Sequence, residues 1–153
     1  MSDTRALYEE VILDHNKNPK NFGSMPDADV VQEGYNPLCG DSFKIYLKLD
    51  GDTVQSVSFE GHGCAISKAS ASLMTTLVKG RKRSKVEELF HVFQEMLKSD
   101  PESPLDTEKL GKLKVFSGVR EYPVRIKCAT LAWHALVAAL HQQEGPVSTE
   151  SGS

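Results

Sequence analysis

The chain has 153 residues, of which 39% are apolar and 25% charged, and a formal net charge of −3. This length and composition predict one globular domain that buries about two-thirds of its unfolded surface without disulfide bonds. The acidic balance argues against nucleic acid as the main partner. No apolar run approaches the roughly 20 residues needed to cross a bilayer, which excludes a membrane-spanning helix.

The N-terminal segment and the cysteine count indicate the compartment. The N-terminal segment "MSDTRALYEE" carries acidic residues and lacks the hydrophobic stretch of a secretory signal. Only three cysteines are present, and an odd number disfavours a disulfide framework. We therefore expect a cytoplasmic protein with free thiols.

The first half of the chain predicts a helix followed by strands. Residues 4–17 carry apolar side chains at helical spacing, and residues 29–35 are expected to form a short edge strand. From Phe43 to Phe59 the pattern favours a hairpin with a three-residue loop, Asp50-Gly51-Asp52, which pairs Phe43 with Phe59. This register gathers the apolar side chains on one face, whereas a two-residue loop would scatter them.

The second half predicts helices. Small residues dominate the first half of the helix that follows Gly61–Cys64 and ends near Val78, which allows a second backbone to approach closely. Ser84 begins a capping-box sequence and is expected to open the next helix. The remaining expected segments are a linker at 99–106, a short helix or turns at 108–118, a helix from Pro123 or Cys128 to Gln142, and a polar, disordered tail at 144–153. The order of elements favours an α+β domain.

The three cysteines all fall at the ends of predicted elements. Cys39 lies in the turn "NPLCGD", Cys64 at a strand-to-helix junction and Cys128 near the start of the last helix. Backbone amides at such ends favour a thiolate. With the carboxylate of Asp41, the three sulfurs would supply the four ligands of a tetrahedral zinc site, because soft thiolates select zinc or iron–sulfur chemistry. Three unrelated buried thiols are the alternative.

Four motifs give the chain a family resemblance. The segments "LDHNKNPKNFG", "NPLCGD", "GHGCAISKASASLM" and "RIKCATLAWHAL" resemble the U-type iron–sulfur cluster assembly family, from Leu7 to about Leu140. The resemblance implies an α+β fold with a three-stranded antiparallel sheet and helices packed on one face. It implies one domain over residues 1–143, with an insertion at about 80–120. It also makes Cys39, Cys64 and Cys128 the family's three cysteines and Asp41 its ligand-shell aspartate.

Departures from the family's scaffold members indicate the SufU branch. Lys127 stands where the scaffold proteins have a ligand histidine, and 63 residues, 65 to 127, separate the last two cysteines. The segment "EYPVRIKC" replaces the scaffold's chaperone-docking Leu-Pro-Pro-Val-Lys. SufU members bind zinc and take up sulfur from a cysteine desulfurase. The resemblance thus implies zinc, with iron or an iron–sulfur cluster as the alternative, and it implies a cysteine desulfurase and a downstream iron–sulfur scaffold as partners.

Cys39 is the predicted sulfur acceptor. A free thiol with a pKa of about 8.5 is mostly protonated in the cytosol, whereas zinc keeps a ligand sulfur ionised. Of the three cysteines, Cys39 alone is expected on a loop, beside Gly40, so it is the ligand best able to leave when a donor docks. Arg125 and Lys127 are candidates for the partner interface. The alternatives are a scaffold on which a cluster is assembled and a domain whose zinc is purely structural.

Two other features have weaker interpretations. His62 could replace the missing histidine ligand, but a histidine at such a strand-to-helix junction more commonly packs on the turn. The basic run Lys79–Lys85 is expected to be a solvated connection between helices, with a docking patch for an acidic partner as the alternative.

Overall fold

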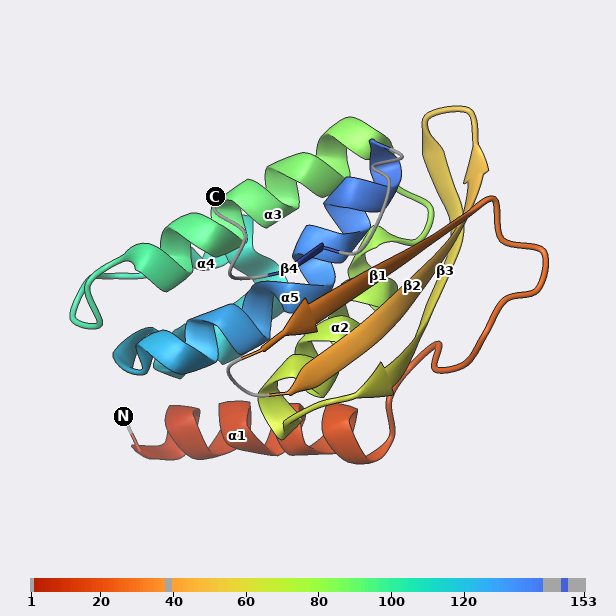
Figure 1. Ribbon diagram of the computed structural model, residues 1–153. Helices are drawn as coiled ribbons and strands as arrows, with labels where there is room; N and C mark the ends of the chain where they lie inside the picture. The colour runs from red at the N-terminus through yellow and green to blue at the C-terminus, as the bar shows by residue number, and fades with distance from the viewer. Residues whose placement is uncertain (1, 38–39, 142–146, 149–153) are drawn as a thin grey trace.

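The computed structural model describes residues 2–37, 40–141 and 147–148. Figure 1 shows one layer of strands with the helices gathered on one side of it, which confirms the predicted α+β class. The elements in chain order are α1 (Ser2–Lys17), β1 (Val30–Asn36), β2 (Asp41–Asp50), β3 (Thr53–His62), α2 (Ala65–Val78), α3 (Arg83–Lys98), α4 (Thr107–Leu110), the 3-10 helix η1 (Gly111–Glu121), α5 (Pro123–Leu140) and β4 (Val147–Ser148). None of the helices described is long and apolar enough to cross a membrane.

The sheet has the strand order β3-β2-β1-β4. Strands β1, β2 and β3 are antiparallel neighbours, as predicted, while β4 pairs with β1 in parallel over two residues. Strand β4 falls within the segment 144–153 that the sequence predicted to be disordered. Val147 and Ser148 are the residues of that segment that the structure describes.

The β2–β3 hairpin corrects the predicted register. Asp50 pairs with Thr53, so the loop has two residues rather than three, and the predicted pairing of Phe43 with Phe59 is wrong. A shift in register between Lys48 and Leu49 leaves Gln55 as an extra residue on β3, which is a β-bulge. Beyond the bulge Ile45 faces Phe59. With a two-residue loop and no bulge, the apolar side chains of β3 beyond Gln55 would lie on the exposed face. The bulge therefore places them on the buried face.

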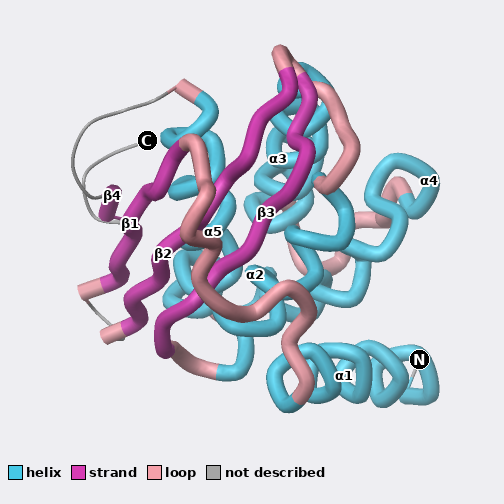
Figure 2. Tube along the Cα trace, turned by 90° about the vertical axis from the view of Figure 1, so that its right-hand side faces the viewer, coloured by secondary structure: helices cyan, strands magenta, loops and turns pink. Residues whose placement is uncertain are grey.

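The inner face of the sheet packs against α2 and α5 (Figure 2). Phe43, Ile45 and Phe59 are buried there. The hydroxyl of Ser70 on α2 donates a hydrogen bond to the carbonyl of Ala129 on α5, because the small side chains of α2 let the two backbones come close, as the sequence predicted. This close approach brings the first half of α2 beside the second turn of α5.

The segment before α3 pairs with the edge of β3. The amide of Val54 donates to the carbonyl of Arg81 at 2.8 Å, and the amide of Arg83 donates to Asp52 at 2.7 Å. Helix α3 begins at Arg83, and its N-cap residue Lys82 makes no side-chain cap hydrogen bond, so the predicted capping box at Ser84 is wrong. Since the carbonyl of Asp52 in the β2–β3 turn satisfies the amide of Arg83, the helix starts where this pairing ends.

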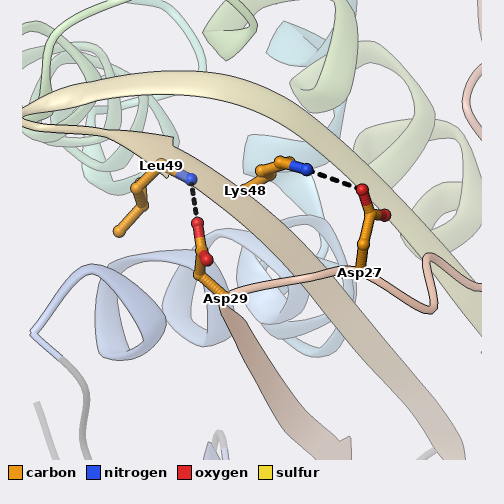
Figure 3. A network of polar contacts seen from close by, with 4 residues as sticks. All are labelled: Asp27, Asp29, Lys48 and Leu49. Carbon is orange, nitrogen blue, oxygen red and sulfur yellow. Dashed lines mark hydrogen bonds and ion pairs between the residues drawn. The ribbon is translucent and has the colours of Figure 1, made fainter.

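The loop between α1 and β1 is fixed at the far end of the sheet. Lys48 forms an ion pair with Asp27, and the amide of Leu49 donates to the carboxylate of Asp29 (Figure 3). The ion pair lowers the pKa of the exposed Asp27 carboxyl. These contacts hold the beginning of β1 against β2, while the other end of β1 leads to the cysteine-bearing turn.

Candidate metal centre

Three predicted ligands meet where β2, α2 and α5 come together. Asp41 is the first residue of β2, Cys64 caps the N-terminus of α2, and Cys128 lies in the second turn of α5. One ligand atom from each lies within 4.8 Å of the other two. Asp41 and Cys128 are buried and Cys64 is partly buried. The fold therefore unites residues that are 87 positions apart in the sequence, 41 to 128.

Asp41 fixes the strand-to-helix junction. Its Oδ1 accepts a hydrogen bond from the backbone amide of Cys64 at 3.0 Å, and its Oδ2 lies 3.9 Å from the Cys64 sulfur. The carboxylate is only 2% exposed. A buried carboxylate requires such partners, because its burial without them is costly. Asp41 thus contacts a second candidate ligand through both of its oxygens.

Cys64 occupies the N-cap position, where a side-chain acceptor normally satisfies a free amide of the first turn. Its sulfur accepts from the amide of Ser67 at 3.5 Å and lies 3.6 Å from the Ser67 hydroxyl. A hydrogen bond with Cys128, together with those from Ser67, lowers the pKa of the Cys64 thiol to about 6, although burial and the charge of Asp41 oppose this shift. The site therefore favours a thiolate at neutral pH.

Cys128 has a partner on β1. The side-chain amide of Asn36 donates to its sulfur, with 3.7 Å between Nδ2 and Sγ, and both residues are buried. This contact connects the end of β1 to α5 across 92 positions of sequence.

Gly63 has no side chain, and the hydroxyl of Ser67 and the carboxylate of Asp41 occupy the space beside it. A Cβ at this position would lie 2.5 Å from the Ser67 hydroxyl oxygen and 2.9 Å from Oδ1 of Asp41. Gly63, Ser67 and Asn36 are not among the site residues predicted from the sequence. The position of Ser67, three residues after a cysteine at a helix start, and that of Asn36, inside the "NPLCGD" motif, were available signals. The need for glycine at position 63 is visible only in the packing.

Cys39, the predicted acceptor, lies outside the described residues. It belongs to the segment that joins β1 to β2, whose ends are paired residues, Asn36 and Asp41. The amide of Gly40 donates to the carbonyl of Asn36 at 2.8 Å, and Gly40 has a φ of 72°, a conformation that favours glycine. Its described neighbours in this turn, Pro37 and Gly40, are exposed.

The other residues singled out from the sequence lie within three positions of a candidate ligand in the chain and outside the group described. Arg125 is exposed, with its guanidinium 5.8 Å from the ring centre of Tyr122, about one turn before Cys128. Lys127 is partly buried next to Cys128. His62 is exposed at the end of β3 and is not part of the ligand group among the described residues.

The donor set suits zinc. In a tetrahedral site with ligands at about 2.0 to 2.3 Å from zinc, two ligand atoms lie about 3.3 to 3.8 Å apart. The three ligand atoms here lie within 4.8 Å of one another, and Oδ2 of Asp41 is 3.9 Å from the Cys64 sulfur, so shifts of about 1 Å would bring them to one ion. Two sulfurs and one carboxylate favour zinc or iron over magnesium or calcium. Asp41, Cys64 and Cys128 fit three positions of a tetrahedral site.

Comparison with known proteins identifies the family of the chain. Residues 7–129 match the family of NifU-like N terminal domains. The chain belongs to this family. Over 140 residues, this NifU-like domain is 43% identical to the zinc-dependent sulfurtransferase SufU of Bacillus subtilis (strain 168), with 92% of this chain and 93% of the relative covered. It is 39% identical over 140 residues to the iron-sulfur cluster assembly scaffold protein IscU of Streptococcus pyogenes serotype M1, covering 92% and 86%.

Solved structures support the fold of the NifU-like domain. A putative iron-sulfur cluster assembly scaffold protein for the SUF system from Fervidobacterium islandicum AW-1 matches with a TM-score of 0.80 and 37% identity, covering 89% of this chain and 98% of that one. The N-terminal part of a NifU-like protein from Brucella abortus matches with a TM-score of 0.79 and 27% identity, covering 88% and 92%. The family and the fold predicted from the motifs are confirmed.

Proposed function

We propose that this NifU-like domain is a zinc-dependent sulfur acceptor in iron–sulfur cluster assembly, which takes sulfur from a cysteine desulfurase onto Cys39. One observation carries the proposal: Asp41, Cys64 and Cys128 form a soft donor set at the base of the turn that contains Cys39. The absence of a histidine before Cys128, where Lys127 stands, and the similarity to the Bacillus subtilis sulfurtransferase favour this role.

The zinc ion would be held by Cys39, Asp41, Cys64 and Cys128. When bound, it keeps its ligand sulfurs deprotonated near neutral pH. The hydrogen bonds of the site act in the same direction, because the amide of Ser67 and the N-terminus of α2 favour negative charge on Cys64.

The transfer itself is a thiol–disulfide type of exchange. The thiolate of Cys39 attacks the terminal sulfur of a persulfide on the desulfurase. A sulfur–sulfur bond forms at Cys39, while the bond between the terminal sulfur and the desulfurase cysteine breaks. The electron pair of the broken bond leaves on the desulfurase thiolate, which can then take a proton. No net oxidation occurs, so no external reductant is needed.

The turn that carries Cys39 begins and ends at described residues that are paired with each other. The Asn36–Asp41 pair and the hydrogen bond between Gly40 and Asn36 hold both ends. Arg125 is exposed on α5 near Cys128, so its guanidinium and the ammonium of Lys127 would bind acidic groups around the donor's active site.

The second candidate function is a scaffold on which an iron–sulfur cluster is assembled and passed on. The same sulfur-rich donor set favours it, since thiolates hold iron–sulfur clusters as well, and the chain is 39% identical to an IscU scaffold. A third possibility is a domain with structural zinc and unreactive thiols. Metal analysis after aerobic purification separates the first two, because a zinc protein is colourless and a cluster protein is brown.

The proposed function is tested by desulfurase turnover, measured as alanine release from cysteine. We expect the wild-type protein to accelerate turnover and Cys39→Ser to abolish the acceleration, because a serine hydroxyl is a poor nucleophile at neutral pH. Peptide mapping should find one added sulfur atom on the Cys39 peptide. The melting temperature of Cys39→Ser serves as the folding control. A persulfide on the Cys64 or Cys128 peptide, with Cys39→Ser still active, would contradict the proposal.

A further inference from the structure

Asn36 lies at a junction of three parts of the candidate centre. It is the last residue of β1 and is 1% exposed. Its side-chain amide donates to the sulfur of Cys128, its carbonyl accepts from the amide of Gly40, and its backbone pairs with Asp41. One residue therefore contacts a candidate ligand on α5, the end of the cysteine-bearing turn and the first residue of β2.

We propose that Asn36 is a positioning residue of the metal centre, whose side-chain amide holds the sulfur of Cys128 in its binding orientation and ties it to the turn that carries Cys39. The inference rests on the proposed function in one respect, namely that Cys128 is a metal ligand.

The physical basis is the burial of the amide. A buried side-chain amide needs hydrogen-bond partners, and the sulfur of Cys128 is one of them, at 3.7 Å. A hydrogen bond to a ligand sulfur fixes its direction, so that the sulfur is held in its binding orientation and is less able to turn away from the metal. Groups of this kind behind metal ligands typically contribute about 10-fold to 100-fold in metal affinity.

The placement also separates this role from simple packing. Asn36 could have been a leucine or valine if its task were only to fill the sheet, because the buried residues farther along that face, such as Phe43 and Ile45 on β2 and Phe59 on β3, are apolar. Gln32 offers a matched comparison, since it lies on the same face of β1 and is buried. Its side-chain amide donates to the carbonyl of Glu33, and it pairs with Ile45, away from the Asn36–Asp41 end of the sheet.

The test compares Asn36→Leu with Gln32→Leu, each of which removes a buried amide from the same face of β1. Zinc release to an excess of a coloured chelator is measured first. We expect release from Asn36→Leu to be about 10-fold to 100-fold faster than from the wild type, and release from Gln32→Leu to be within about 3-fold of it. In the cobalt-substituted proteins, the sulfur-to-metal charge-transfer band should move to lower energy in Asn36→Leu alone, because the sulfur loses a hydrogen bond.

A measurement on the unmutated chain keeps the inference testable if Asn36→Leu does not fold. In protein loaded with cadmium-113, a hydrogen bond to a metal-bound sulfur transmits a scalar coupling between the amide proton and the metal nucleus. We expect this coupling at the side-chain amide of Asn36. Its absence in a protein whose Cys128 shows direct coupling to cadmium would overturn the inference, as would unchanged release and charge-transfer energy in folded Asn36→Leu. None of these measurements uses the desulfurase, so they can fail or succeed separately from sulfur transfer.

Discussion

Oδ1 of Asp41 lies 3.0 Å from the backbone nitrogen of Cys64 and accepts its hydrogen bond. A candidate ligand on β2 therefore determines where the next ligand stands at the start of α2. In the proposed metal centre the carboxylate has two tasks, to offer an oxygen to the metal and to hold a helix terminus, and substitutions can separate them.

Asp41→Asn and Asp41→Ala should differ. Asparagine keeps an oxygen that can accept from the amide of Cys64 but loses the negative charge, whereas alanine removes both. We expect Asp41→Asn to retain part of its zinc and nearly wild-type stability. We expect Asp41→Ala to lose about 1 to 3 kcal/mol of unfolding free energy, because a buried amide is left unsatisfied. Metal analysis and urea unfolding measure the two effects. If both variants had the zinc affinity and the sulfur-transfer rate of the wild type, Asp41 would not be part of the site.

Cys64→Ala and Cys128→Ala should lose zinc and melt at lower temperature. A structural zinc ion contributes on the order of 10 kcal/mol, which is comparable with the roughly 5 to 15 kcal/mol of a whole domain. The variants are compared with wild-type protein, with and without a chelator, by metal analysis and thermal unfolding. The ligand assignment is wrong for any cysteine whose alanine variant keeps one zinc per chain and the wild-type melting temperature.

Gly63→Ala should weaken zinc binding, because the added methyl group would press on Oδ1 of Asp41 and the hydroxyl of Ser67 at 2.9 and 2.5 Å. The matched control is Gly118→Ala, since a Cβ at Gly118 meets no atom within 4 Å. Chelator competition measures zinc affinity in both. We expect at least about a 10-fold loss in Gly63→Ala and no loss in the control, and equal affinities would show that the site accommodates the methyl group.

The zinc-free protein should show an acidic thiol at Cys64. Its pKa of about 6 lies below the ordinary value of 9.0, so alkylation of the Cys64 peptide by iodoacetamide should reach half its maximal rate near pH 6. Because the folded pKa is the lower one, ionisation of Cys64 stabilises the folded state fully above pH 9. This contribution decreases as the pH falls and is lost below about pH 6.

The unfolded chain in urea provides the reference for this titration. There the alkylation midpoint of the same peptide should return to the range of an ordinary thiol, because Ser67 and Cys128 no longer surround the sulfur. A folded midpoint as high as the unfolded one would contradict the proposed hydrogen bonding of the Cys64 sulfur.

Much of this protein follows from local patterns in the sequence. Helical spacing of apolar residues gave α1, α3 and α5, and the alternation from Phe43 to Phe59 gave the hairpin. The motifs around Asp41, Cys64 and Cys128 identified three side chains that the fold brings together. These features could be predicted because they depend on periodicity and on the chemistry of short segments, which neighbours distant in sequence change little.

The tertiary structure decided what depends on distant neighbours. The bulge at Gln55 sets the hairpin register, because the buried face of β3 must match that of β2 beyond a two-residue loop. The start of α3 at Arg83 is set by pairing with β3. Gly63 is needed because the Asp41 carboxylate fills the space beside it, and Asn36 gains its contact because β1 ends against α5. The contacts of Gly63 and Asn36 join positions up to 92 residues apart, and only the packing of β1, β2, α2 and α5 around one point creates them.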